Sequence, residues 1–254
     1  MDARLIAFER LLNIMDDLRE NCPWDKKQTI DSLRYLTIEE VYELSDAIIN
    51  NDLDEIKKEL GDIMLHLVFY SKIATEKKVF DITDVLNGIC EKLIHRHPHI
   101  YGDVKVSSEE DVKANWEKLK LKEGKQSVLQ GVPNSLPAMV KAIRIQEKAR
   151  GVGFDWDNKE QVWEKVEEEL NELKEEVEKE NLQSTQEEFG DLLFSLINYA
   201  RFLRVNPEDA LEKTNKKFIK RFQYMEEKVA VNGLEISSLS LAEMDRYWNE
   251  AKSI

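Results

Sequence analysis

The sequence predicts an all-α protein made of two tandem antiparallel helical bundles, and two observations carry this prediction. The first is composition: 35% of the 254 residues are charged, and the chain has only nine glycines and five prolines. Long stretches rich in Glu, Lys and Leu are typical of helices, and no segment has a convincing strand pattern. The second is a repeat, because TIEEVYEL (37–44) and VEEELNEL (166–173) lie 129 residues apart, as do ELGD (59–62) and EFGD (188–191).

The repeat extends outward with small insertions and divides the chain. The further matching pairs are CPWDKKQ (22–28) with FDWDNKE (154–160), EKLIHRH (91–97) with KKFIKRF (216–222), and Trp116 with Trp248. Glycine, serine and proline cluster between the copies, which is typical of a linker. We therefore expect a first domain over 1–121, a linker over 122–137 and a second domain over 138–254.

Each half is expected to hold four or five helices of about 15–25 residues with short connections, an arrangement typical of antiparallel bundles. Three helix starts can be placed from N-cap signals. These signals are Asp157 three residues before Glu160, Asn206 directly before Pro207, and Ser240 three residues before Glu243.

The helices with the first acidic motif carry an apolar stripe bordered by glutamates. In the second half, Glu169 borders the stripe, Glu172 follows one turn on, and Glu168 points nearly the opposite way, at about 100° per residue. Glu40 and Glu43 hold the matching positions in the first half. The stripe residues are Val41, Leu44 and Ile48 in the first half, and Val162, Val166, Leu170, Leu173 and Val177 in the second. Taken alone, such a Glu-rich face is typical of a solvated surface.

The helices with the second motif place acids in apolar surroundings. Glu59 and Asp62, like Glu188 and Asp191, stand one turn apart on helices that continue as IMLHLVFY or LLFSLINYA. Carboxylates near a core are costly and repel each other. A glycine inside a helix costs about 1 kcal/mol relative to alanine, so we expect close approach of a neighbouring helix or ligand at the glycine within each pair, Gly61 and Gly190.

A divalent cation would relieve this repulsion. Two carboxylates from each of two neighbouring helices can surround a hard ion with oxygen ligands, which suits Mg²⁺, with Mn²⁺ as the alternative. The rival hypothesis is a ferritin-like di-iron bundle, which uses a Glu-x-x-His pattern. No histidine in this chain stands three residues after a glutamate, so oxygen ligands and phosphate chemistry are favoured over redox chemistry.

Basic and aromatic residues recur at matching places. Lys92 with Arg96, and Lys217 with Arg221, share a helix face at i, i+4, where they could hold phosphate oxygens or be plain surface charge. Trp248 and its counterpart Trp116 could stack on a base or pack in a core. The HRHPH cluster (95–99) has no cysteine partner and no second copy, so a helix-terminating turn at Pro98 is preferred over a zinc site.

Composition excludes some partners. The net charge of −14 argues against binding a nucleic-acid polymer, which needs clustered Lys and Arg. Cys22 and Cys90 indicate no disulfide framework, the first residues lack the pattern of a signal peptide, and no apolar run approaches the ~18 residues that a membrane span needs. We therefore expect a cytoplasmic protein without a membrane partner.

These motifs together resemble the MazG family of two-domain all-α nucleoside triphosphate pyrophosphohydrolases, over both halves of the chain. Besides EExxE followed by ExxD, the shared segments are CPWD (22–25), RHPHIYGD (96–103), GVPNSLPA (131–138), GFDW (153–156) and KFIKRF (217–222). The resemblance implies cleavage of a nucleoside triphosphate between the α- and β-phosphates, giving the monophosphate and pyrophosphate, with Mg²⁺ required. It also implies pairing of bundles in a homodimer.

The resemblance assigns roles residue by residue. The implied metal ligands are Glu169, Glu172, Glu188 and Asp191, with Glu40, Glu43, Glu59 and Asp62 as the first-half copy. Glu168 is the candidate for positioning the attacking water or for supporting the ligands from outside. The implied substrate contacts are Lys165, Lys217, Arg221 and Trp248. A further family lysine is replaced here by Ser184. Leu36 replaces Lys165 in the first half, which favours the second half as the catalytic one.

A second hypothesis comes from a different class of protein. The acidic balance and the duplication would also suit a non-catalytic nucleotide sensor or a helical adaptor protein. Tight nucleotide binding without pyrophosphate release would indicate the sensor.

Overall fold

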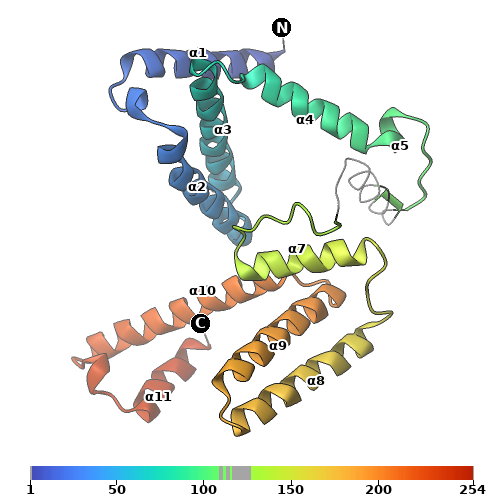
Figure 1. Ribbon diagram of the computed structural model, residues 1–254. Coiled ribbons are helices and arrows are strands. Elements are labelled where there is room, and N and C mark those ends of the chain that lie inside the picture. The colour runs from blue at the N-terminus through green and yellow to red at the C-terminus, as the bar shows by residue number, and fades with distance from the viewer. Residues whose placement is uncertain (1, 109–110, 113–114, 116–126, 254) are drawn as a thin grey trace. The chain divides into compact units, whose positions relative to one another are not determined.

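The structure, a computed structural model, describes residues 2–108, 111–112, 115 and 127–253 (Figure 1). The chain divides into two compact units, Met1–Ser107 and Ser108–Ile254. Neither unit contains a β-strand within the described residues, and the acidic helices occur twice, which confirms the predicted tandem all-α fold. Trp116 and the start of the expected linker lie outside the described residues, so the expected domain limits stay predictions.

The first unit is organised around two antiparallel helices, α2 (Ile30–Asn50) and α3 (Leu53–Glu76) (Figure 1). Their connection is short because Asn51 ends α2 in the left-handed conformation (φ 55°). Asp52 then caps α3 by accepting two hydrogen bonds from backbone N–H groups of its first turn. The other elements of this unit are α1 (Ala3–Asn21), the 3₁₀ turn η1 (Asp25–Lys27), α4 (Ile82–Arg96) and α5 (Pro98–Tyr101).

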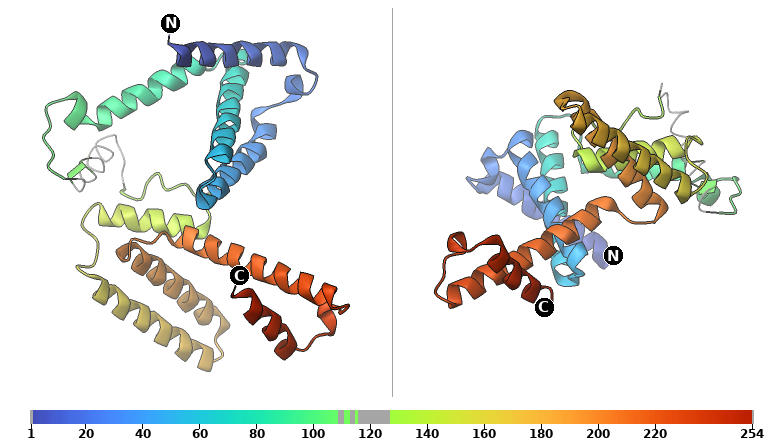
Figure 2. Two further views of the ribbon diagram at one scale, coloured as in Figure 1. Left: turned by 180° about the vertical axis from the view of Figure 1, so that it is seen from behind. Right: turned by 90° about the horizontal axis from the view of Figure 1, so that it is seen from below.

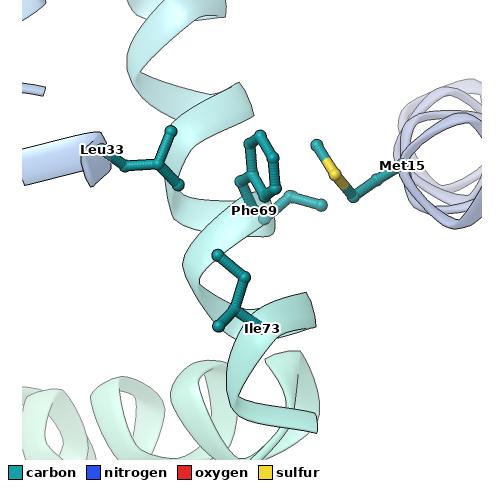
Figure 3. Close-up of a cluster of buried hydrophobic side chains, with 5 residues drawn as sticks. Met15, Leu33, Phe69 and Ile73 are labelled. Atoms are coloured by element: carbon teal, nitrogen blue, oxygen red, sulfur yellow. The ribbon is translucent and has the colours of Figure 1, made fainter. Parts of the chain in front are cut away.

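A small apolar cluster packs α1 against the α2–α3 pair. Met15 from α1, Leu33 from α2, and Phe69 and Ile73 from α3 point toward one another (Figure 3), and none is more than 3% exposed. Burying such side chains contributes about 1.5–3 kcal/mol each. The cluster therefore sets the register of α2 on α3, and with it the positions of their acids.

The second unit repeats this hairpin with α8 (Lys159–Glu178) and α9 (Leu182–Phe202), which lie side by side in every view (Figure 2). Both helices begin 129 residues after α2 and α3 do, so the repeat seen in the sequence is a repeat of structure. The remaining elements are α7 (Ala138–Arg150), α10 (Pro207–Val231), the 3₁₀ turn η2 (Ile236–Ser238) and α11 (Leu241–Ala251).

Two of the three expected caps are confirmed. Asn206 caps α10 with Pro207 in its first turn, and Ser240 caps α11 in a reciprocal capping box with Glu243. The expectation for α8 was wrong by one residue, because Asn158 is the N-cap and its side chain accepts from the backbone of Gln161. Asp157 and Asn158 are both good caps, so propensity could not separate them.

The apolar stripes are only partly buried within their own units. Val162 and Val166 are 1% and 3% exposed, whereas Val177 at the far end of α8 is 55% exposed. On α2, Val41 and Ile48 are 51% and 54% exposed. The described residues of each unit therefore leave apolar helix surface uncovered.

None of the described helices is both long enough and apolar enough to cross a membrane.

Truncating the centre of the first core should destabilise the first unit. Leu33 is fully buried between α1 and α3, so Leu33→Ala is expected to lower the free energy of unfolding by about 3 kcal/mol through lost burial and a residual cavity. Leu53→Ala is the matched control, because Leu53 is 78% exposed. Urea unfolding followed by circular dichroism measures both, and equal midpoints for the two variants would contradict the assigned core.

Candidate functional site

Three carboxylates of the second unit converge across the α8–α9 hairpin. Glu169 and Glu172 stand one turn apart on α8 and Glu188 stands on α9, and one oxygen of each lies within 4.8 Å of the others. Glu169 is buried (6% exposed), Glu188 is half-buried and Glu172 is exposed. We call these residues the second acid trio. It is anchored in the helix pair and open to solvent on one side.

The trio is electrostatically strained. Burial, together with the charges of Glu172, Glu169 and Asp191, raises the pKa of Glu188 above its ordinary value. The cause is that like charges at this separation disfavour one another's ionised form. A cation placed between the three oxygens would remove both penalties.

Lys165 partly supplies such a cation. Its Nζ lies 2.7 Å from Oε1 of Glu169 and 2.8 Å from Oε1 of Glu168, one turn along the same helix. These two carboxylates raise the pKa of Lys165, so the lysine is charged at neutral pH. Glu168 is exposed and outside the trio, as its predicted direction away from the stripe implied.

The fourth expected ligand in each half lies just outside the trio. Asp191 is exposed and does not belong to the group of oxygens within 4.8 Å, although its charge contributes to the raised pKa of Glu188. Asp62 is half-buried and in the same way helps to raise the pKa of Glu40. The structure thus brings three of the four acids together and leaves the aspartate within electrostatic range.

The first unit forms the equivalent cluster from Glu40 and Glu43 on α2 and Glu59 on α3, with oxygens again within 4.8 Å. We call it the first acid trio. Glu59 is 1% exposed, and its Oε1 is 3.1 Å from Nζ of Lys58, which also binds Glu55 at 2.5 Å. The Lys58 ammonium holds the pKa of Glu59 below its ordinary value.

The lysine beside each trio stands on a different helix of the hairpin: on the first helix in the second unit, and on the second helix in the first unit. Lys165 belongs to α8, and the matching residue of α2 is Leu36; Lys58 belongs to α3, and the matching residue of α9 is Glu187. Sequence reasoning missed Lys58, although its place directly before Glu59 was a usable signal. Each unit therefore has one lysine on its most buried carboxylate.

These residues fit a divalent cation of the Mg²⁺ type. Oε2 of Glu59 is buried and has no hydrogen-bond partner among the described residues, which is costly for a carboxylate oxygen. All members of both trios offer oxygen, the donor that Mg²⁺ and Mn²⁺ prefer. No histidine belongs to a cluster of three or more metal-binding groups in the described part of the chain.

Three of the four expected substrate residues, Lys217, Arg221 and Trp248, form a separate group on α10 and α11, whereas Lys165 lies on α8. Trp248 packs on Phe218 with ring centroids 4.9 Å apart, and the guanidinium of Arg221 lies 6.0 Å from the Trp248 ring. Lys217 is exposed beside them. Within the described residues, no hydrogen bond or ion pair joins this group to the second acid trio.

The first-half counterparts of Lys217 and Arg221 show no clearer sign of a binding site. Lys92 is exposed and Arg96 half-buried on α4. His97 ends α4, with its Nδ1 2.6 Å from the carbonyl of Leu93, and Pro98 starts α5. The preferred interpretation of HRHPH as a helix-terminating turn is confirmed.

The two motif glycines face open space. A Cβ built at Gly61 or Gly190 would meet no described atom within 4 Å. The expectation that a neighbouring helix approaches there was wrong for the helices of the same unit, because each glycine lies on the uncovered side of its hairpin. The alternative of an approaching ligand stays a prediction.

A pocket of about 450 Å³ opens beside the second acid trio. Its wall comes from the segment before α8 and from the first three turns of α8, and it includes Lys165 and Glu168. Sequence reasoning did not find it, although the GFDW segment that supplies Trp156 was noted. The other lining residues are Asp155, Trp156, Asp157, Gln161 and Glu164.

Comparison with known proteins agrees with this geometry. A family model described as the MazG nucleotide pyrophosphohydrolase domain matches residues 28–101 and 157–225, which span both acid trios. The chain is 48% identical over 252 residues to the nucleoside triphosphate pyrophosphohydrolase/pyrophosphatase MazG of Thermotoga maritima, covering 97% of this chain and 96% of that protein. It is 41% identical over 254 residues to the nucleoside triphosphate pyrophosphohydrolase of Escherichia coli K12, covering 96% and 97%.

A solved structure is also similar to part of the chain. The crystal structure of a mazG-related protein from Thermotoga maritima is 29% identical, covers 44% of this chain and 98% of that chain, and superposes with a TM-score of 0.40, which adds nothing to the fold assignment. The family match is carried by sequence over both units, with the EExxE and ExxD carboxylates brought together in each. The chain therefore belongs to the MazG nucleotide pyrophosphohydrolase family.

Proposed function

We propose that the protein is a Mg²⁺-dependent nucleoside triphosphate pyrophosphohydrolase, with Mn²⁺ as an alternative metal. It would cleave ribo- or deoxyribonucleoside triphosphates between the α- and β-phosphates to the monophosphate and pyrophosphate. The observation that carries the proposal is the acid trio, whose oxygens lie within 4.8 Å of one another on a helix pair that matches the family. The names of the relatives from Thermotoga maritima and Escherichia coli support the reaction.

The acids of the second unit would act as metal ligands. Glu169, Glu172 and Glu188 would hold the cation, and Asp191 would join them by a small movement of its exposed side chain. When bound, Mg²⁺ supplies a lowered pKa for water and neutralises charge on the phosphates. Glu168 would orient the attacking water and accept its proton, since it is exposed beside the trio and hydrogen-bonded to Lys165.

Lys165 would change partners when the substrate arrives. Its Nζ neutralises Glu168 and Glu169 in the free protein. A cation on Glu169 would replace that role and release the ammonium to a phosphate oxygen, where a lysine acts as a point charge. Arg221 and Lys217 would hold further phosphate oxygens, with Trp248 beside them.

We propose a homodimer as the working form. Large apolar side chains stay exposed on the helices around the site, among them Phe189, Leu193 and Phe218 at 53%, 44% and 55%. A second copy would cover such surface, and it would offer a second set of α10 and α11 residues to each acid trio.

The second unit is proposed as the catalytic one. The first helix of its hairpin, α8, carries Lys165 at the edge of the pocket. The matching position on α2 of the first unit is Leu36. The first acid trio is complete in Glu40, Glu43 and Glu59 and would bind metal. Its role in turnover is settled by comparing matched variants.

Glu172→Gln and its first-unit counterpart Glu43→Gln test both the metal role and the choice of unit. Both residues are exposed members of a trio, so neither change disturbs a core. With dNTPs and Mg²⁺, we expect pyrophosphate release to fall about 100-fold or more in Glu172→Gln, because losing such an electrostatic contact costs 10²–10³ in rate. Glu43→Gln should keep most of the wild-type activity.

Product identity and a surface control complete this assay. Glu178→Gln, at the exposed end of α8, should match the wild type. Release of orthophosphate in place of pyrophosphate would sink the proposed reaction. Loss of activity in Glu43→Gln alone would move catalysis to the first unit.

Glu188→Gln should raise the melting temperature of the metal-free protein at pH 7. The pKa of Glu188 is raised on folding from its ordinary 4.5, so the native state holds this proton more tightly, and the group destabilises the fold as pH rises through that window. The gain should vanish below about pH 3.5, where the carboxyl is protonated in both states.

Mg²⁺ should reverse the order of the melting temperatures of the wild type and Glu188→Gln. Mg²⁺ is expected to raise the melting temperature of the wild type at pH 7, because it binds the native state alone. Glu188→Gln should gain much less. Differential scanning fluorimetry with EDTA and with MgCl₂ measures both effects, and an equal Mg²⁺ shift in the two proteins would remove Glu188 from the ligand set.

A further inference from the structure

We propose that the pocket before α8 binds the base of the nucleotide, with Trp156 as the stacking surface and Glu164 and Asp157 as acceptors for its amino group. The inference rests on the proposed function and extends it to base selection. It gives the chain a preference for bases with an amino group, namely adenine, cytosine and guanine, over thymine and uracil.

The pocket adjoins the second acid trio through Lys165, so a base in the pocket would leave the phosphates on the side of the trio. Lys165 and Glu168 belong to the pocket wall, and Lys165 is 2.7 Å from Glu169 of the trio. The pocket volume of about 450 Å³ is of the size that small ligands occupy in proteins. One nucleotide could therefore span from the pocket to the metal.

The acidic wall of the pocket favours the uncharged base of the nucleotide over its triphosphate. Of the four acids in the pocket wall, Asp155 is paired with Arg201 and Glu168 with Lys165, whereas Asp157 and Glu164 have no ion-pair partner among the described residues. A triphosphate would be repelled from such a wall, whereas a neutral ring with N–H donors would not. The phosphates therefore belong to the metal side of Lys165 and the base to the other side.

Trp156 is available for stacking. It is 40% exposed, and within the described residues its ring has neither an aromatic nor a cationic partner. The neighbouring tryptophans are engaged: Trp163 packs on Tyr199 at 5.0 Å and donates to Glu167, while Trp248 packs on Phe218. A free ring face on a pocket wall suits a nucleobase, since stacking contributes about 1–3 kcal/mol per base.

The segment that carries Trp156 is anchored at two places. Nη1 and Nη2 of Arg201 on α9 both donate to the carboxylate of Asp155, Nη1 at 2.8 Å, and Arg150 at the end of α7 lies 3.6 Å from that carboxylate. The same carboxylate accepts the backbone N–H of Trp156 at 3.0 Å. Asp155 thus positions the stacking ring before any ligand binds, which reduces the entropy lost on binding.

Glu164 and Asp157 supply the selectivity. Neither side chain has a hydrogen-bond or ion-pair partner among the described residues. An ionised carboxylate only accepts, so it favours the exocyclic amino groups of adenine, cytosine and guanine over the N3–H of thymine, which is flanked by two carbonyls that repel the carboxylate. The first unit has Tyr35 and Leu36 at the positions of Glu164 and Lys165, so the feature is specific to the second unit.

Steady-state kinetics on dATP, dCTP, dGTP and dTTP with Mg²⁺ test the inference. Trp156→Ala should raise KM about tenfold with little change in kcat, as expected when a stacking contact is lost. Trp156→Phe should recover most of that loss because a ring is kept. The matched control is Trp24→Ala, the counterpart in the first unit, which is 56% exposed and should leave all four KM values unchanged.

Base preference gives a sharper readout. Glu164→Gln should lower the ratio of kcat/KM for dCTP to that for dTTP about fivefold or more, because the glutamine amide can donate to a thymine carbonyl. Far-UV circular dichroism checks that each variant folds. An unchanged ratio, together with equal KM values for Trp156→Ala and Trp24→Ala, would overturn the inference while leaving the proposed reaction intact.

A different failure would concern the proposed function itself. If the wild type does not release pyrophosphate from any nucleotide, the proposed reaction is wrong. Calorimetric titration of dCMP without metal then tests the pocket alone. Binding that Trp156→Ala weakens about tenfold supports the base site; equal binding by both proteins overturns it. Weaker Mg²⁺ binding by Glu164→Gln with an unchanged base ratio would show a cation site instead.

Discussion

The crowding of carboxylates across each helix hairpin is the constraint on which the rest of this structure depends. Three acid side chains from two helices bring oxygens within 4.8 Å of one another, and the innermost of each trio, Glu59 or Glu169, is at most 6% exposed. Such groups lose hydration and gain repulsion on folding. The hairpins can hold them only because apolar packing elsewhere, such as the cluster around Leu33, keeps the helices in register.

Each unit moderates this strain with one lysine, but from a different helix. Lys58 reaches Glu59 from its own helix α3, and Lys165 reaches Glu169 along α8. An ammonium close to a buried carboxylate acts as a counter-ion until a metal takes its place. Lys165, on the first helix of its hairpin, borders the pocket before α8, whereas Lys58 stands on the second helix of its own hairpin. The duplicated units can therefore share a metal-binding geometry and differ in what they do with a nucleotide.

The second unit separates its charges in space. Acids gather at the α8–α9 hairpin, the pocket beside it is also acidic, and the basic residues Lys217 and Arg221 lie on α10. In the proposed reaction the acids would hold a metal that neutralises phosphate charge, and the basic residues on α10 would hold further phosphate oxygens. The ion pair between Asp155 and Arg201 fixes the segment before α8 to α9, and with it one wall of the pocket.

Much of the fold followed from local chemistry. The 129-residue repeat and the composition predicted the tandem all-α fold, and local signals predicted the caps at Asn206 and Ser240. These predictions were possible because helix periodicity and capping act over a few neighbouring residues. The cap at Asn158 in place of Asp157 was missed, since the two neighbours have nearly equal propensity. The empty space beside Gly61 and Gly190 was missed because glycine spacing does not tell which side of a helix is covered.

The sequence by itself determined which residues form the hairpins and which of their acids share a helix face, because spacing along a helix sets direction. Only the tertiary structure decided that Asp62 and Asp191 stand outside the trios and that Trp156 lines a pocket. These facts depend on the register and separation of two packed helices. Register and separation are set by interlocking side chains from distant parts of the chain, which spacing along a single helix does not encode.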